Sequence, residues 1–432
     1  MSLIILPNQL FAKKYIPKDI HTIILYEHPA FFTKYKFNKL KLLLHRVSMK
    51  KYAEVMVQYF TVKYFNFNEN PVYPINNVYH FFQPNNIKIP GEVIKTPNFL
   101  CIDLFKKYRD KTDKFVFNNF YLWMKKNLDI IPDVKSKDKY NRNKIPTSEI
   151  KYIPKDSVFT IDILKNSIRY INIHFKNNYG PDLNETLIYF PFTHAQANKL
   201  LTEFIQYKIK DFGKYQDALI FNDLNTVNNQ NISLYHSFLS SSVNIGLLQP
   251  IDIINKLLDV SQSYKKVNIN SLEAFIRQLF WRDYQLYCYT YMSLNKCTFN
   301  NKLKLNKKWF EGSTGIYPVD ITIKKAFAFG YLHHIERLMV MGNFMLLYGI
   351  SPKETYKWFM IFSIDSYEWV MYQNVYDMIY GMGNGMRRFY ISSSNYILKM
   401  SNIKKDTWCQ VWDDLFHKFL KKNKNKIGYP YE

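Results

Sequence analysis

The chain has 432 residues, of which 47% are hydrophobic, so it is long enough for two or three packed domains and is not a disordered polypeptide. Lys and Arg number 59 against 35 Asp and Glu, which gives a formal charge of +24. A charge of this sign and size indicates a polyanionic partner, with nucleic acid first among the candidates. The alternative is a genome rich in A and T, which inflates Lys, Asn, Ile and Tyr together.

The cysteines and the apolar runs limit the class of protein further. The four cysteines show neither C-x-x-C spacing nor a His at ligand spacing, which argues against a zinc site and against a disulfide framework; they are Cys101, Cys288, Cys297 and Cys409. No run reaches 18 apolar residues, and the first ten residues lack a signal-peptide pattern. We therefore expect a soluble, intracellular monomer without a membrane partner, in a compartment that the sequence does not specify.

The first 129 residues carry the pattern of an α/β domain. Short apolar runs predict buried strands, and longer periodic stretches predict helices. The expected strands are residues 3–6, 22–26 and 78–82, and the expected helices are residues 39–59 and 102–109. The order β, β, α, β indicates a small doubly wound domain. A G-x-G-x-x-G dinucleotide fingerprint is absent from the sequence.

The rest of the chain divides into a linker and a helical domain. Residues 130–194 contain a polar, proline-punctuated stretch, which predicts an interdomain linker. Apolar residues recur with helical spacing through residues 195–432, which predicts an all-α domain. Within it, residues 324–347 are apolar almost all round and predict one buried helix.

Six blocks in a fixed order connect the chain to a known family. They are residues 211–218, 235–240, 244–248, 273–284, 330–339 and 365–375. Together these blocks resemble the photolyase-related branch of the cryptochrome/photolyase superfamily, which includes bacterial (6-4) photolyases. The resemblance implies the photolyase/cryptochrome fold, in which an antenna-type α/β domain precedes an all-helical catalytic domain that binds FAD.

Residues for the cofactor follow from the blocks. Ser237 and Ser240 form a Ser-x-x-Ser turn at the expected start of a helix, where hydroxyls and free backbone N–H groups suit a pyrophosphate. An ordinary helix N-cap explains the same pattern. By resemblance, Tyr215, Arg277 and Trp281 also lie along FAD, with core packing as the alternative for Trp281.

The apolar stretch 324–347 carries the candidate catalytic groups. His334 and Arg337 share a helix face by their three-residue spacing. The resemblance implies that Arg337 pairs with Asp365 beside the flavin ring. It also implies that His334 gives a proton to the lesion once reduced flavin has passed it an electron, and that His333 orients His334. A His suits this task because its pKa lies near neutrality. A His pair in a core or on a surface is the alternative.

The same resemblance assigns residues to the flavin edge and to electron transfer. It places Met371 at the edge of the flavin ring and Trp358 nearest to the flavin, with Trp309 farther out. Phe359 stands where related proteins have an oxidisable Tyr, so the electron path differs at this point.

Three residues near the expected lesion pocket are candidates for contact with damaged DNA. Tyr390 is the candidate for contact with the lesion itself. Arg387 and Arg388 are the candidates for contact with its backbone.

The sequence also departs from the family. Pro318 stands where the iron–sulfur members have their first cluster cysteine, and Cys409 is out of register with the others, so we expect no iron–sulfur cluster and no other metal. Trp408 and Trp412 are expected to pack in its place. Asn8 replaces the Asp of the lumazine-binding members, so a second, antenna chromophore is unknown.

The sequence therefore predicts a light-driven, FAD-dependent DNA photolyase, a carbon–carbon lyase of the (6-4) type that acts on damaged DNA. A blue-light receptor of the cryptochrome kind and a photolyase for cyclobutane pyrimidine dimers are the alternatives. His334 and the charge of +24 favour repair. The sequence leaves open the lesion, the antenna chromophore and the full electron-transfer path.

Overall fold

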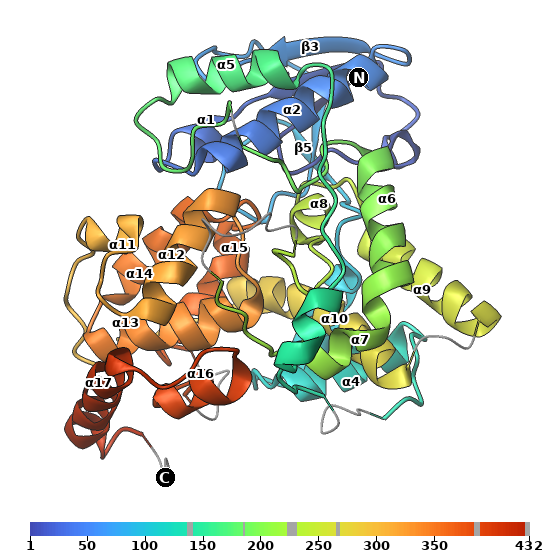
Figure 1. The fold of residues 1–432 in the computed structure, drawn as a ribbon. Helices are drawn as coiled ribbons and strands as arrows, with labels where there is room; N and C mark the ends of the chain where they lie inside the picture. Colours follow the sequence, from blue (N-terminus) through green and yellow to red (C-terminus); the bar gives the residue numbers. More distant parts are fainter. Residues whose placement is uncertain (136–140, 185, 223–230, 265–267, 384–388, 428–432) are drawn as a thin grey trace.

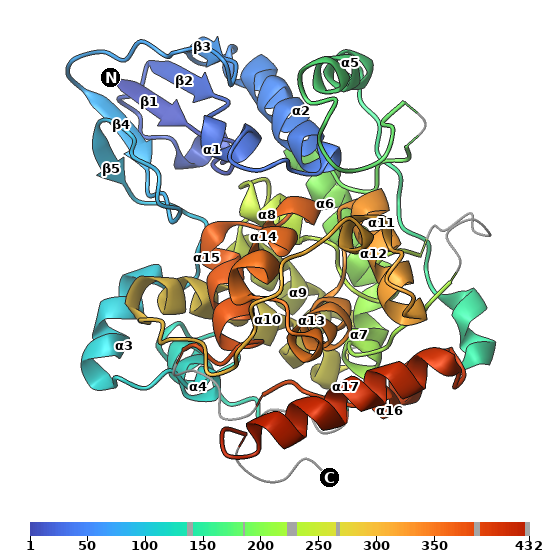
Figure 2. The same cartoon turned by 90° about the vertical axis from the view of Figure 1, so that its left-hand side faces the viewer.

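The structure is a computed structural model that describes residues 1–135, 141–184, 186–222, 231–264, 268–383 and 389–427. A parallel sheet with its flanking helices lies at one end, and a larger helical part lies below it (Figure 1). Figure 2 shows the last long helix lying across the base of the helical part, near the C-terminus.

Five parallel strands form one sheet in the order β3-β2-β1-β4-β5. They are β1 (Ser2–Ile5), β2 (Thr22–Tyr26), β3 (Thr61–Phe65), β4 (Val78–Phe81) and β5 (Glu92–Ile94). In the centre, Ile4 of β1 lies opposite Ile24 of β2 on one side and His80 of β4 on the other. The chain extends the sheet first on one side of β1 and then on the other, so the doubly wound arrangement is confirmed.

Strands β1, β2 and β4 and the first long helix were predicted, whereas β3 and β5 were missed. All residues of β1 are buried, and a strand buried on both faces appears in the sequence as a continuous apolar run. The residues of β3 and β5 are exposed or only partly buried. Both strands lie at sheet edges, where sequence patterns are weak.

The first 174 residues also form short helices and one long helix. They are α1 (Pro29–Phe32), α2 (Lys39–Met56), α3 (Phe105–Lys111), α4 (Phe117–Asn127) and α5 (Leu164–His174), with 3₁₀ turns η1 (Lys13–Tyr15), η2 (Ile102–Leu104) and η4 (Thr147–Tyr152). Contacts divide them differently from the expected boundaries at 129 and 194. Helices α3 and α4 pack on the helical part, since Phe105 of α3 contacts Tyr287 there and Tyr121 of α4 donates to Glu273 there. Helix α5, inside the expected linker, packs on α2.

The remainder of the described chain is helical. Its α-helices are α6 (His194–Glu203), α7 (Ile209–Tyr215), α8 (Ser240–Asn244), α9 (Pro250–Tyr264), α10 (Ile269–Tyr291), α11 (Lys308–Glu311), α12 (Tyr317–Phe329), α13 (Asn343–Tyr348), α14 (Pro352–Phe362), α15 (Glu368–Met371), α16 (Ser394–Met400) and α17 (Thr407–Asn423). Three π-helical stretches interrupt them: η5 (Phe204–Lys208), η6 (Glu336–Gly342) and η7 (Tyr372–Asp377). Even α10, with 23 residues, carries Glu273, Arg277 and Asp283. Within the described ranges, no helix is both long and apolar enough to cross a lipid bilayer.

The N-terminal half of α2 docks the sheet onto the helical part. Asn38 accepts a hydrogen bond from the backbone N–H of Leu40 and so caps α2, while its amide donates to the carbonyl of Phe327 at 3.0 Å. About two turns further on, the ring of His45 lies 2.9 Å from the hydroxyl of Tyr367. A single hydrophobic cluster extends from the sheet into the helical part. The two parts therefore share one core.

The prediction of a single helix over residues 324–347 is wrong. Helix α12 ends at Gly330, whose φ of +62° is left-handed. A Cβ at this position would lie 2.6 Å from Cγ2 of Ile364, so the neighbouring segment also excludes a side chain there. The chain then continues as η6 and α13. A lone Gly in an apolar run gives no sign of such a break.

We expect Gly330→Ala to destabilise the protein by more than the about 1–2 kcal/mol of left-handed backbone strain, because the contact with Ile364 adds to it. Chemical denaturation measures the change. Gly315→Ala is the matched control, since Gly315 has a φ of +88° but nothing within 4 Å of its Cβ position. Equal losses in the two variants would show that the contact with Ile364 contributes nothing.

The tryptophans of α17 are buried, as residues near a core should be. Trp412 is fully buried, contacts Phe344 with ring centroids 4.9 Å apart and donates from Nε1 to the carbonyl of Ser392. Trp408 lies beside it. Pro318 is buried in the first turn of α12. The expectation that no iron–sulfur cluster is bound stays a prediction.

Candidate active site

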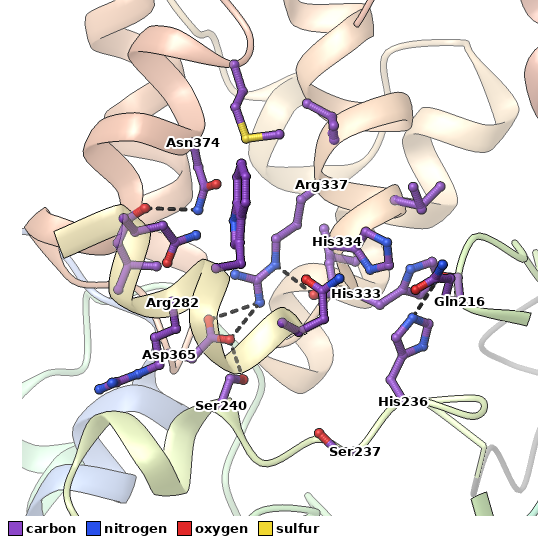
Figure 3. A pocket seen from close by; sticks show the side chains of 18 of the residues that line it. Gln216, His236, Ser237, Ser240, Arg282, His333, His334, Arg337, Asp365 and Asn374 are labelled. Carbon is purple, nitrogen blue, oxygen red and sulfur yellow. Dashed lines mark hydrogen bonds and ion pairs between the residues drawn. The ribbon is translucent and has the colours of Figure 1, made fainter. Parts of the chain in front are cut away.

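A cavity of about 420 Å³ opens among α8, α10, η6 and the segment that follows α14. Its volume lies in the range of cofactor and substrate pockets. Figure 3 shows Ser240, Asp365 and Arg337 joined in a row along one wall, with His236, His333 and His334 grouped beside them. The cavity therefore combines a charged wall and a histidine group.

The charged wall is an ion pair between Arg337 and Asp365. Nη2 of Arg337 lies 2.9 Å from Oδ1 of Asp365, while its Nε donates to the carbonyl of Leu332. The hydroxyls of Ser240 and Ser363 donate to the same carboxylate. Burial raises the pKa of Asp365, but Arg337 and the two hydroxyls outweigh it and hold the pKa below its ordinary value. Asp365 is therefore ionised.

Two arginines of α10 have donors that lack acceptors. Within the described residues, Nε of Arg277 and Nη2 of Arg282 are buried and have no hydrogen-bond partner, although both side chains line the cavity. The rest of the Arg282 guanidinium is bonded, through Nε to Asn244 and through Nη1 to the carbonyl of Asn98. The two guanidinium groups place positive charge beside the cavity, so an anionic ligand fits this wall.

Three histidines gather at the other side, with ring nitrogens within 4.8 Å of one another. His236 stacks on His333 with centroids 4.6 Å apart. Burial lowers the pKa of His236 to about 3 and lowers that of His333 well below its ordinary value. Both rings are therefore neutral near pH 7. The side chain of His334 is 47% exposed, so it faces the cavity mouth.

Asp217 holds the exposed histidine. Its Oδ1 lies 3.3 Å from Nε2 of His334, and its Oδ2 lies 3.5 Å from Nη1 of Arg142. Burial raises the pKa of Asp217, but His334 and Arg142 outweigh burial and the net pKa is lowered. Neither Asp217 nor Arg142 was predicted. Asp217 lies two residues after Tyr215, and Arg142 lies in the expected linker. Neither position indicates in the sequence that the two side chains meet.

Comparison with known proteins extends these observations. Residues 3–84 and 75–185 match the family described as "Deoxyribodipyrimidine photo-lyase-related protein". A (6-4) photolyase of Agrobacterium fabrum is 32% identical over 293 residues, which are 63% of this chain and 55% of that protein. An uncharacterized protein of Acanthamoeba polyphaga mimivirus is 52% identical over 92 residues, which are 21% of this chain and 75% of that protein.

Solved structures show the same fold along the whole chain. A cryptochrome of Synechocystis is 15% identical, covers 99% of this chain and 90% of its own, and has a TM-score of 0.62. The match over residues 3–185 and the shared fold relate the chain to the photolyase-related branch of the cryptochrome/photolyase superfamily. A photolyase of Sulfolobus tokodaii, solved with two FAD molecules, is 13% identical, covers 99% of this chain and 92% of its own, and has a TM-score of 0.57. The chain matches little more than half of the length of the Agrobacterium fabrum protein.

Most residues expected from the photolyase resemblance line the cavity. Those that do, besides the ion pair and His333 and His334, are Ser237, Ser240, Arg277, Trp281, Met371 and Tyr390. Tyr215 does not. It is the last residue of α7, is buried against Tyr235 in a separate small cluster and donates to Glu149 at 2.5 Å. The next two residues, Gln216 and Asp217, reach the cavity instead. Arg387 and Arg388 lie outside the described residues.

The expected electron-transfer residues lie behind the cavity wall. Phe359 lines the cavity, and the ring of Trp358 packs against it with centroids 5.3 Å apart. Nε1 of Trp358 donates to the carbonyl of Trp309 at 2.8 Å, and both rings are buried. Tyr348, which was not predicted, contacts Trp309 at 5.5 Å and is 45% exposed. Oxidisable rings therefore extend to the surface.

The expected antenna segment is bonded within the protein. The side-chain amides of Asn8 and Gln83 donate to each other at 3.1 and 2.9 Å. The amide of Gln9 donates to the carbonyl of Phe81. The identity of a second chromophore stays open.

Proposed function

We propose that the chain is a light-driven, FAD-dependent DNA repair enzyme of the (6-4) photolyase type. The observation that carries this proposal is the cavity itself. It combines the Arg337–Asp365 ion pair, the positively charged side chains of Arg277 and Arg282, and the exposed His334. An anionic cofactor and a proton donor for a substrate are the two needs that such a cavity meets.

The residues present fit FAD. The guanidinium groups of Arg277 and Arg282 and the hydroxyl of Ser237 suit its pyrophosphate. Arg337 and Asp365 suit the polar edge of its ring system, and the thioether of Met371 offers an apolar contact. When bound and reduced, the flavin supplies an electron under light.

His334 is the residue that handles the proton. Asp217 lies against its Nε2, which orients the ring and leaves Nδ1 for a substrate. His333 is fully buried beneath it, next to Glu336, and so supports the position of the pair. In this proposal His334 donates a proton to the lesion at Nδ1 and takes it back after the bonds have rearranged.

Damaged DNA is the proposed partner. The net charge of +24 provides the long-range attraction to phosphates. A lesion must leave the base stack to enter an active-site cavity, and the partly exposed ring of Tyr390, which lines this one, offers a stacking surface. Arg142 adds a cation on the same rim.

The decisive test uses an oligonucleotide that carries a defined (6-4) lesion. The reduced protein is illuminated with it, and restored thymines are measured by chromatography. Repair supports the proposal. Bound FAD without repair of this lesion overturns it, and a parallel assay with a cyclobutane dimer separates a different photolyase from a receptor without repair activity.

We expect Trp358→Phe to slow photoreduction of bound FAD by an external thiol to a small fraction of the wild-type rate. A phenyl ring keeps the packing against Phe359 but is far harder to oxidise, and the bond to the carbonyl of Trp309 is lost. Absorbance of the flavin during illumination measures the rate. Trp369→Phe is the control, because Trp369 is an equally buried ring that packs on Phe99 and Arg282 instead. Equal rates in both variants would contradict a role for Trp358.

A further inference from the structure

A buried lysine from the sheet domain reaches the rear of the cavity wall. Lys41, in the first turn of α2, is 1% exposed. Its Nζ donates to the backbone carbonyl of Ser366, and it lies 4.8 and 5.1 Å from the ring centroids of Phe37 and Tyr367. An ammonium has three donors, and a carbonyl with two rings satisfies it poorly.

The carbonyl that Lys41 holds belongs to the segment that carries Asp365. Residues 363–367 join α14 to α15, and Ser366 follows Asp365 directly. Asn244 fixes the same segment from the cavity side by donating to the carbonyl of Asp365 at 2.9 Å. On the sheet side, His45 bonds to the hydroxyl of Tyr367. Helix α2 therefore holds the segment at two points, immediately after Asp365.

Lys41 lies in a place that is unfavourable for a charge. Burial lowers its pKa to about 7, with Asp365 raising it and Arg337 lowering it. The folded pKa lies below the unfolded value of about 10.4, so the penalty on stability is complete below pH 7 and disappears as pH rises toward 10. A methionine would fill the same space without this penalty. The titratable groups that face Lys41 are His45 on α2, Asp365 and Tyr367 on the segment, Arg337 on η6, and the Lys34–Glu368 pair at the surface.

We propose that Lys41 is a positioning residue of the cavity. Through the carbonyl of Ser366 it fixes the Asp365 carboxylate against Arg337, and its ammonium adds a positive charge behind the wall that the flavin contacts. The proposal rests on the proposed function, since the ligand is taken to be FAD. It explains why a costly buried cation lies at this point of the domain interface.

The test compares Lys41→Met with Lys125→Met. Lys125 is also buried, at 2% exposure, and also donates to backbone carbonyls, those of Ile131 and Val134, but it lies on α4 and does not line the cavity. FAD affinity is measured by fluorescence, the flavin midpoint potential by redox titration at pH 6 and pH 9, and stability by denaturation.

We expect Lys41→Met to bind FAD about tenfold more weakly. We also expect a more negative midpoint potential at pH 6 than in the wild type, because a positive charge near the reduced flavin is lost, and a smaller difference at pH 9, where the amine of Lys41 is neutral. Lys125→Met should change stability alone. If Lys41→Met does not fold, Lys41→Gln replaces it in the test, because it keeps a hydrogen-bond donor without the charge. Lys41→Gln should shift the midpoint potential in the same direction.

Unchanged affinity and potential in both Lys41 variants would overturn the inference, as would equal changes in Lys125→Met. Failure of the wild type to bind FAD would instead overturn the proposed function. The two failures are therefore distinguishable in one set of measurements.

Discussion

Replacing His334 by alanine is expected to lower the rate of (6-4) lesion repair by about 10²–10⁴, the usual contribution of a positioned acid or base. Bound FAD should be retained, because the side chain is 47% exposed and its charged contact within the described residues is with Asp217. Repair of the defined lesion in single-turnover illumination measures the rate, and the ratio of flavin to protein absorbance measures retention.

His417→Ala is the matched control, since His417 is an exposed histidine on α17 that contacts Phe416 and lies away from the cavity. If His334→Ala repaired the lesion at the wild-type rate, His334 would not be the proton donor. The protein would then be a photolyase that acts without this group. Loss of flavin in His334→Ala would instead show that the imidazole supports the cofactor.

Asp365→Asn is expected to destabilise the protein by about 3–5 kcal/mol and to abolish retention of FAD. The amide leaves the largely buried guanidinium of Arg337 without its counter-charge, and the hydroxyls of Ser240 and Ser363 lose an ionised acceptor. Denaturant unfolding measures the stability, and gel filtration with flavin absorbance measures retention. Asp413→Asn is the control, because Asp413 accepts two hydrogen bonds from Ser394 and pairs with no cation within the described residues.

The loss in Asp365→Asn should depend on pH. The folded pKa of Asp365 is lowered, so its carboxylate contributes its full stability above the unfolded value of about 4 and loses that contribution as pH falls further. The gap between the wild type and Asp365→Asn should therefore narrow below about pH 4. A gap that stays constant down to pH 3 would mean that charge does not cause it.

Features with a strong local signal could be predicted from the sequence. Strands β1 and β2 are continuous apolar runs because they lie inside the sheet, and α2 follows Asn38, a good N-cap. The edge strand β3 could not be recognised because its exposed face breaks the pattern. The break at Gly330 depends on the side chain of Ile364, which comes from another segment.

The residues of the candidate site likewise divide into those that the sequence could predict and those that it could not. Arg337 and Asp365 were paired through resemblance to a family, since 28 residues separate them and spacing alone would not join them. Asp217 and Lys41 were missed because their roles depend on what lies across the fold. A lysine within a helix predicts an exposed side chain, and only the packed domain interface shows that this one is buried.

The π-helical stretches η6 and η7 both border the cavity, through Leu338 on η6 and Asn374 on η7. A π turn holds one residue more than an α turn, so each stretch is equivalent to a single-residue insertion in an ordinary helix. Deleting one residue from η6 would allow a regular α-helix to form while the residues on either side keep their facing, because the π turn confines the extra residue to the bulge. Relatives that differ in length by one residue here would therefore differ at the bulge itself and present the same flanking side chains to the cavity.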